Sequence, residues 1–229
     1  MKGKATDTQL IYETLRDEIM FLQLAPGEGI SEAEIGKRFQ VSRTPVREVF
    51  KRLEQDGLVE VRPQRGTFVT RIDLAQLSDM LFEREALEIA VLRELCLRVN
   101  ENGLLKLKLL LLEQQRLLDA DVSRSEFVRA FLTADNQFHE TLYTLADRHG
   151  VWDLTAAHRP HYNRFRILND SMNEQMAQTI YQRHQDLVDA LACQDLKRLE
   201  ALSSQHMYNR ADNITAILRA FPDYFIMGR

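Results

Sequence analysis

The chain has 229 residues, with 30 Lys plus Arg against 34 Asp plus Glu, a net charge of -4 and 45% hydrophobic residues. These values are typical of a folded protein, and the length favours two domains over one. The most apolar run begins at Leu104, but Lys106 and Lys108 interrupt it well before the roughly 20 apolar residues that a bilayer span needs. No apolar segment typical of a secretory signal follows the N-terminus. We therefore expect a cytoplasmic protein with no membrane partner.

Positive charge is concentrated in one part of the first third of the chain. Residues 37–71 contain nine Lys or Arg residues and four acidic residues, a local net charge of +5, whereas residues 72–229 have a net charge of -5. A basic stretch of this kind suits the phosphate backbone of a nucleic acid. It also suits an ordinary solvated face, so the residue pattern must decide between the two.

Two helices are predicted before residue 41. The first, residues 8–24, carries apolar residues close to a 3.6-residue repeat and stops at the breaker APGEG. Its apolar positions are Leu10, Ile11, Leu15, Ile19 and Leu22. The second is short and follows Ser31, which we expect to act as the N-cap in a reciprocal capping box with Glu34.

A third helix and a hairpin follow. Ser42 or Thr44 can cap the helix, Pro45 is tolerated in its first turn, and Gly57 ends it. The predicted buried positions are Val46, Val49, Phe50 and Leu53, at i, i+3, i+4 and i+7. The side chains of Arg47 and Lys51 point away from this stripe. After Gly57, two short alternating strands flank RPQRG, where Gly66 can adopt the positive φ of a tight turn.

Three helices and a two-stranded wing form a winged helix-turn-helix, a fold whose third helix fits the major groove of double-stranded DNA. The stretch VSRTPVREVFKRLEQDGLVEVRPQRGTFV, residues 41–69, closely resembles the DNA-binding signature of the GntR family of bacterial transcription regulators. Many relatives have Ala-Leu where this chain has Val49 and Phe50, a difference in the core rather than at the DNA. The resemblance implies major-groove contacts by the third helix and a minor-groove contact by the wing. The expected DNA-binding residues are Arg38, Ser42, Arg43, Thr44, Arg47, Lys51, Arg65 and Gly66.

From about residue 74 onward, the residue pattern predicts helices. Breaks are predicted near residues 102–103, 121–125, 149–150, 169–173 and 193–195, which gives six or more helices and an antiparallel bundle. The expected fold class is mainly α. A winged helix-turn-helix domain covers residues 1–72, and an all-helical domain for effector binding and dimerisation covers residues 73–229.

A candidate metal site lies in this second part. Asp135 and His139 are four residues apart, so both project from one face of a predicted helix. His184 and His206 lie on two later helices, and from spacing alone these residues could equally be ordinary surface or core positions. In the FadR branch of the GntR family, the C-terminal FCD domain is similar in having Asp-x-x-x-His on one helix and single His residues on two later ones. The resemblance therefore implies a divalent metal ion, and this donor set favours zinc or nickel over calcium or magnesium.

An effector can also be predicted. Four protein ligands leave open positions on an octahedral ion for a small carboxylate, and Arg84 matches an Arg that many relatives turn toward the ligand. The alternative places Arg84 on a solvated face as an i,i+4 partner of Glu88. Asn163 and Arg164 are weaker candidates for lining the same cavity.

The resemblance implies a homodimeric repressor that binds a palindromic operator and senses a small organic acid. One alternative is a regulator for which the metal itself is the signal. Another is a metal-dependent hydrolase, but the chain has no His-Glu-x-x-His motif and no nucleophile signature. Glu140 lies about 100° around the helix from His139, which is a poor position for a general base. We therefore expect that the chain is not an enzyme.

Overall fold

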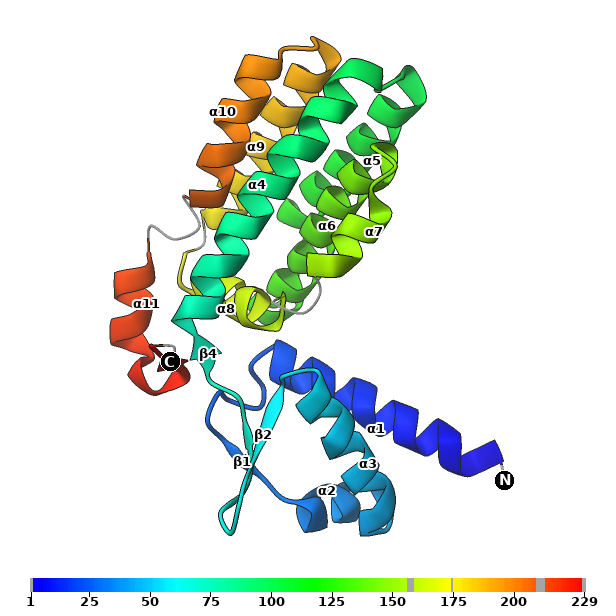
Figure 1. The fold of residues 1–229 in the computed structure, drawn as a ribbon, viewed down its shortest axis with the longest axis vertical. Coiled ribbons are helices and arrows are strands. Elements are labelled where there is room, and N and C mark those ends of the chain that lie inside the picture. The colour runs from blue at the N-terminus through cyan, green and yellow to red at the C-terminus, as the bar shows by residue number, and fades with distance from the viewer. Residues whose placement is uncertain (1, 156–158, 174, 209–212, 228–229) are drawn as a thin grey trace. The chain divides into compact units, whose positions relative to one another are not determined.

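The computed structural model describes residues 2–155, 159–173, 175–208 and 213–227. The chain divides into two compact units, one formed by Met1–Ala75 with the segment from Phe221 onward, the other by Gln76–Ala220 (Figure 1). Helices account for most of both units, which confirms the mainly α fold class. Within the described ranges, every helix is too short or too polar to cross a bilayer.

The first unit is built on three helices: α1 (Lys2–Met20), α2 (Glu32–Phe39) and α3 (Arg43–Gln55). The predicted stripe of α3 is correct, since Val46, Val49, Phe50 and Leu53 are all buried. These side chains pack in one apolar core with those of α1, and α3 contacts both α1 and α2. The burial of this stripe leaves the opposite face of α3 to the solvent.

The apolar stripe of α1 differs from the prediction at both ends. Ile11, Leu15 and Ile19 are buried at i, i+4 and i+8, whereas Leu10 is 58% exposed because it lies about 100° around the helix from Ile11. Helix α1 ends at Met20, and Leu22 adopts a left-handed φ of 60° beyond that end. The predicted helix is therefore too long at its C-terminus, and its buried stripe includes Tyr12 and Met20 in place of Leu10 and Leu22.

The predicted cap of α2 is only partly correct. Ser31 Oγ accepts hydrogen bonds from the backbone amides of Ala33, at 3.2 Å, and Glu34, at 3.5 Å. Over the described part of the chain, the reciprocal capping box is found at the start of α6 (Arg124–Leu145), where Ser123 and Glu126 form it. Ser31 therefore caps α2 without the bond expected from Glu34.

The wing has one strand more than predicted. Strands β2 (Val59–Arg62) and β3 (Gly66–Val69) form an antiparallel hairpin with Arg62 opposite Gly66. Gly66 has a φ of +106°, as expected for a position that favours glycine. Strand β1 (Gly29–Ile30) pairs with the other edge of β3, so the sheet has the order β1-β3-β2. A two-residue strand carries no alternating pattern from which it could be predicted.

A second small sheet involves the end of the chain. Strand β4 (Ile72–Asp73) pairs in parallel with β5 (Phe225–Ile226), which follows the short 3-10 helix η2 (Pro222–Tyr224). Ile72 and Phe225 lie opposite each other and are both buried. The segment from Phe221 therefore groups with the first unit, although the sequence analysis assigned it to the second domain.

The second unit is an all-helical bundle, as predicted. Helix α5 (Glu101–Leu118) packs against both α6 and α9 (Met176–Ala192), and α9 packs against α10 (Leu196–Tyr208). The first break falls at residues 99–100 rather than 102–103, because Asn100 caps α5 by accepting a bond from the Gly103 amide at 2.9 Å. The helices are α4 (Leu74–Arg98), α5 (Glu101–Leu118), α6 (Arg124–Leu145), α7 (His149–Leu154), α8 (Arg159–Met172), α9 (Met176–Ala192), α10 (Leu196–Tyr208) and α11 (Ile214–Ala220).

The two leucines of α1 provide a matched test of the first unit. Leu15 is fully buried, so Leu15→Ala should lower the free energy of unfolding of this unit by about 2–5 kcal/mol through lost apolar burial and a residual cavity. Leu10→Ala removes the same atoms from an exposed position and should change it by less than about 0.5 kcal/mol. Urea unfolding followed by circular dichroism measures both. Equal effects of the two substitutions would contradict this packing of α1.

Candidate metal centre and nucleic-acid interface

The N-terminus of α3 presents polar and basic side chains to the solvent. Arg43, Thr44, Arg47 and Lys51 are all exposed. Thr44 and Lys51 lie opposite the buried stripe, and Arg43 lies at its margin. Ser42 occupies the N-cap position, but its side chain makes no capping hydrogen bond. A hydroxyl and several cations at the positive end of a helix form a favourable site for a phosphate group.

An open groove joins this helix end to the wing. Arg43 lines the groove from α3, Arg65 from the turn between β2 and β3, and Gly66 from the start of β3. Strand β1 and the first residues of α2, including Glu32, complete it. Of the eight residues predicted to contact DNA, Arg43, Arg65 and Gly66 line this groove.

Two of the predicted DNA-binding arginines are engaged in ion pairs. Arg38 donates two hydrogen bonds to the carboxylate of Glu18 on α1, one of them at 2.8 Å, and this bonding raises the pKa of Arg38. Arg47 Nε lies 3.0 and 2.9 Å from the two carboxylate oxygens of Glu32 on α2. Arg38 therefore links α2 to α1, whereas the pair formed by Arg47 lies beside the groove.

The four predicted metal ligands come together inside the second unit. Asp135 and His139 project from α6, His184 from α9 and His206 from α10, and all four are fully buried. One potential ligand atom from each lies within 4.8 Å of the others. The Nε2 atoms of His139 and His206 are 3.2 Å apart, and Asp135 oxygens lie 3.8 Å from His139 Nε2 and 3.7 Å from His184 Nε2.

These separations fit a single divalent ion. Metal bonds of roughly 2.1 Å place adjacent ligand atoms about 3.0 Å apart in an octahedral site and about 3.4 Å apart in a tetrahedral one. The observed spacings need only small shifts to reach these values. Three imidazole nitrogens and one carboxylate suit zinc, nickel or a similar ion better than calcium or magnesium.

Outer groups orient two of the histidines. Glu88 Oε2 lies 2.8 Å from His139 Nδ1, and Gln114 Oε1 lies 2.9 Å from His184 Nδ1. The Gln114 amide nitrogen in turn donates to the carbonyl of Ala134 at 3.4 Å. An acceptor at Nδ1 favours the tautomer whose Nε2 lone pair is available to a metal.

Burial and neighbouring charges determine the protonation states of His139 and Glu88. Burial lowers the pKa of His139, with the Glu88 carboxylate opposing the shift, so the imidazole is held neutral. Burial by itself raises the pKa of Glu88, but His139 and Arg84 outweigh it and keep that pKa below its usual value. An ionised Glu88 facing a neutral His139 is the arrangement that supports a metal-binding imidazole.

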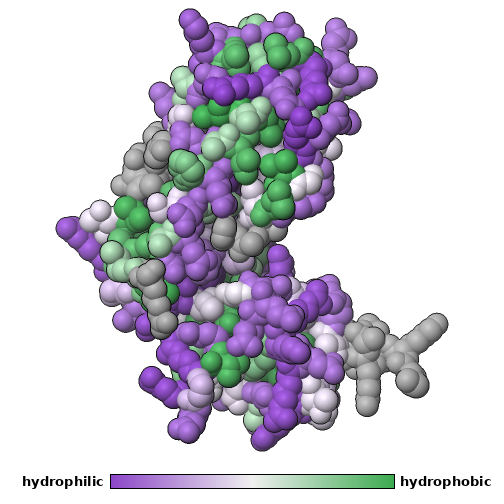
Figure 2. Space-filling model, viewed as in Figure 1, coloured by the Kyte–Doolittle hydropathy of each residue, from purple (hydrophilic) through white to green (hydrophobic). Residues whose placement is uncertain are grey.

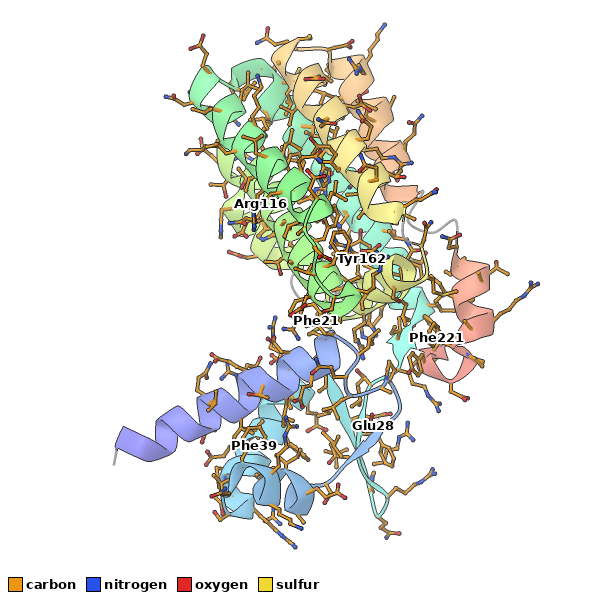
Figure 3. All side chains as sticks on the ribbon, turned by 180° about the vertical axis from the view of Figure 1, so that it is seen from behind. Phe21, Glu28, Phe39, Arg116, Tyr162 and Phe221 are labelled. Carbon is orange, nitrogen blue, oxygen red and sulfur yellow. The ribbon has the colours of Figure 1, made fainter. Side chains whose placement is uncertain are left out.

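Two buried arginines border the cluster. Arg166, on α8, donates to the Asp135 carboxylate and to Asn136 Oδ1, the latter at 2.7 Å. Arg84, on α4, lies 3.4 Å from Glu88 Oε2. The guanidinium groups of Arg84 and Arg166 lie 4.9 and 5.3 Å from the ring centre of Tyr162, which is labelled in Figure 3. The cluster is therefore linked to cationic groups on two further helices.

The sequence analysis missed several members of this arrangement. Gln114, Tyr162 and Arg166 match no motif, and only their position in the folded bundle reveals them. Glu88 was considered solely as an exposed partner of Arg84, yet both side chains are buried. Of the weaker candidates, Asn163 and Arg164 are also buried, and burial lowers the pKa of Arg164 to about 10.

Comparison with known proteins gives two family matches. Residues 8–69 match the model for bacterial regulatory proteins of the gntR family, and residues 79–209 match the FCD domain. The chain is 33% identical over 218 residues to the HTH-type transcriptional repressor RspR of Escherichia coli K12, covering 95% of this chain and 92% of the relative. It is also 33% identical, over 221 residues, to an HTH-type transcriptional regulator in an unstable DNA locus of Streptomyces ambofaciens. This match covers 96% of this chain and 90% of the relative.

A solved structure supports the fold. A putative GntR transcriptional regulator from Rhodococcus sp. RHA1 superposes with a TM-score of 0.71 at 23% identity, covering 94% of this chain and 99% of that one. Every protein named in these comparisons is a transcription regulator.

The metal cluster can be tested by elemental analysis of the purified protein. We expect about one divalent ion per chain and loss of most of it in His184→Ala, which removes a buried donor. His149→Ala is the matched control, because His149 is exposed and contacts only Glu140 and Asp153 among the ion pairs of the described chain. An equal metal content in all three proteins would contradict the assignment of this cluster.

Proposed function

Because the chain belongs to the GntR family of bacterial regulatory proteins and carries an FCD domain, we propose that it represses transcription and senses a small carboxylate at a divalent-metal site. The chain is a transcription regulator rather than an enzyme. The main support for acid sensing is the buried cluster of Asp135, His139, His184 and His206. Repression is proposed because the similar Escherichia coli protein is named a repressor.

The position of the donors favours the FadR branch of the family. Asp135 and His139 share one helix, and His184 and His206 come from two later ones, which is the arrangement of that branch. A double-stranded operator is the proposed partner of the groove, and a cytoplasmic location is proposed with it.

The balance of buried charge favours an anionic effector. Within the described part of the second unit, the buried charged residues are three arginines and three acids: Arg84, Arg164, Arg166, Glu88, Asp135 and Asp170. Occupancy of the cluster by a divalent cation adds two positive charges to this balanced set. An uncompensated buried charge is costly, so an anion that enters with the metal is favoured.

A carboxylate suits both kinds of group at this site. The metal would supply open coordination positions, and Arg84 would supply two parallel hydrogen bonds to a carboxylate. Arg84 lies 3.4 Å from Glu88 and stacks near Tyr162, so its guanidinium is already held beside the cluster. Arg166 is the second cation within reach, since it contacts the ligand Asp135 directly.

The route from this site to the DNA-binding unit follows the backbone. Helix α4, which carries Arg84, begins directly after β4, and α11 packs on α8 and leads into η2 and β5. Because β4 and β5 pair with each other, a shift of α4 relative to α8 would change the position or the pairing of these two strands. The effector can act in this way only if it binds two arrangements of the chain with different affinity.

A homodimer is proposed as the active form. On α5, Leu105, Leu109 and Leu112 are more than half exposed at i, i+4 and i+7, and Figure 2 shows apolar areas on the surface of the helical unit. A second copy of the chain would cover such a stripe. Two-fold symmetry of the protein would match a palindromic operator.

Arginine substitutions test the proposed DNA-binding groove. Arg43→Ala should weaken binding to DNA selected by the parent protein at least about fivefold, because a base contact is worth roughly 1–3 kcal/mol. Arg38→Ala is the comparison, since that side chain is paired with Glu18 on α1 and is not among the residues that line the groove, so it should weaken DNA binding less than Arg43→Ala does. Fluorescence anisotropy with labelled duplexes measures binding. Equal losses of affinity would show that the groove does not distinguish the two arginines.

A thermal-shift screen of small carboxylic acids tests the effector site. One class of acid should stabilise the metal-loaded protein, by about 2.7 kcal/mol at a hundred times its dissociation constant. Arg84→Lys should abolish this response while retaining the metal, because an ammonium cannot reproduce the two-pronged contact. Arg93→Lys on the same helix is the control, since Arg93 forms an exposed pair with Glu200. If DNA affinity instead responds to metal removal alone and no acid acts, the metal itself is the signal and the acid proposal is wrong.

A further inference from the structure

One acidic side chain stands on the surface that is proposed to face DNA. Glu32 is the first residue of α2 and lines the same groove as Arg43 and Arg65. Both of its carboxylate oxygens lie within 3.0 Å of Arg47 Nε, and the side chains of Glu32 and Arg47 are 31% and 67% exposed. The pair joins two helices across 15 positions of the chain, so it is a tertiary contact rather than a helical neighbour pair.

A carboxylate at this position opposes phosphate binding. Contacts with the DNA backbone depend on net positive charge, and Glu32 reduces the charge that Arg47 offers to a phosphate. A groove that recognised phosphates alone would bind DNA more tightly without Glu32. Glu32 must therefore contribute something to DNA recognition other than affinity for the DNA backbone.

The geometry of the pair provides such a contribution. A guanidinium has five N–H donors in a rigid plane, and bonding at Nε leaves the two terminal nitrogens, which together can donate to guanine O6 and N7. Restraining the long side chain before binding lowers the entropy that is lost when the base contact forms. Arg47 lies on the exposed face of the helix that fits the major groove.

We infer that Glu32 determines DNA sequence specificity by holding Arg47 in position to read a guanine, while weakening the use of Arg47 on phosphates. This inference rests on the proposed DNA-binding function. Glu32 is a positioning residue here, since it acts on the base through Arg47.

A purely structural role for Glu32 makes a different prediction. Glu32 and Glu34 are both acidic residues in the first turn of α2, where negative charge favours a helix N-terminus. Glu34 is exposed and forms no ion pair within the described chain. Glu34→Gln thus removes the same charge from the same helical turn without disturbing Arg47, and is the matched control for Glu32→Gln.

The test is selection from a random double-stranded DNA library with the full-length chain, followed by sequencing. Four proteins are compared: the parent, Glu32→Gln, Glu34→Gln and Arg47→Ala. We expect Arg47→Ala to lose the preference for guanine at one position of each half-site. Glu32→Gln should reduce the preference at that same position by about fivefold or more, the lower limit for a bidentate base contact. Glu34→Gln should leave it unchanged.

Binding to random-sequence duplexes gives a second readout that a structural role would not produce. Glu32→Gln should bind this DNA several-fold more tightly than the parent, with a steeper dependence on salt, because Arg47 is released for a phosphate. Glu34→Gln should show a smaller change.

Three results would overturn the inference. They are an unchanged sequence preference in Glu32→Gln, a loss at a position different from that of Arg47→Ala, and an equal loss in Glu34→Gln. Failure of the parent protein to enrich any sequence would instead overturn the proposed DNA-binding function itself, so the two failures are distinguishable.

Discussion

The arrangement of the helical unit depends on charge that is buried but compensated. Asp135 and Glu88 have no measurable solvent exposure, and each contacts an arginine and a histidine, Asp135 with Arg166 and Glu88 with Arg84. A buried ion of either sign would be unstable without its partner. This requirement explains why α8 is buried along residues 161–170 although its sequence, HYNRFRILND, is strongly polar. Arg166 of α8 pairs with Asp135 of α6, whereas Glu88 of α4 pairs with Arg84 of the same helix. Asp135 is itself a proposed metal ligand, and Glu88 lies beside the ligand His139.

In the DNA-binding unit the basic residues lie on the surface, whereas the charged residues of the metal cluster are buried. Ion pairs with acids of neighbouring helices restrain two of these basic residues, Arg38 with Glu18 and Arg47 with Glu32. Exposed pairs of this kind contribute little to stability. Their effect is to fix where a long side chain points, which matters more for recognition of a base edge than for folding.

The sequence was most informative where a periodic pattern and a local motif coincided. The buried stripe of α3, the wing glycine at 66 and the i,i+4 pair of Asp135 and His139 all follow from local spacing. Contacts between segments distant in the chain could not be predicted in this way. The bond of Gln114 to His184 spans 70 positions, and Arg166 reaches Asp135 over 31. The pairing of β4 with β5 joins residue 72 to residue 225, and neither two-residue strand has a recognisable pattern.

The proposed effector response depends on a divalent cation bound by the buried Asp-His cluster of the second unit. Anomalous X-ray diffraction from crystals of the purified protein would locate this ion. We expect one anomalous peak per chain, within roughly 2.0–2.2 Å of an Asp135 oxygen and of nitrogens of His139, His184 and His206. Absence of that peak in protein purified without chelators, with His139 and His206 still in direct contact, would contradict a metal-binding role for the cluster.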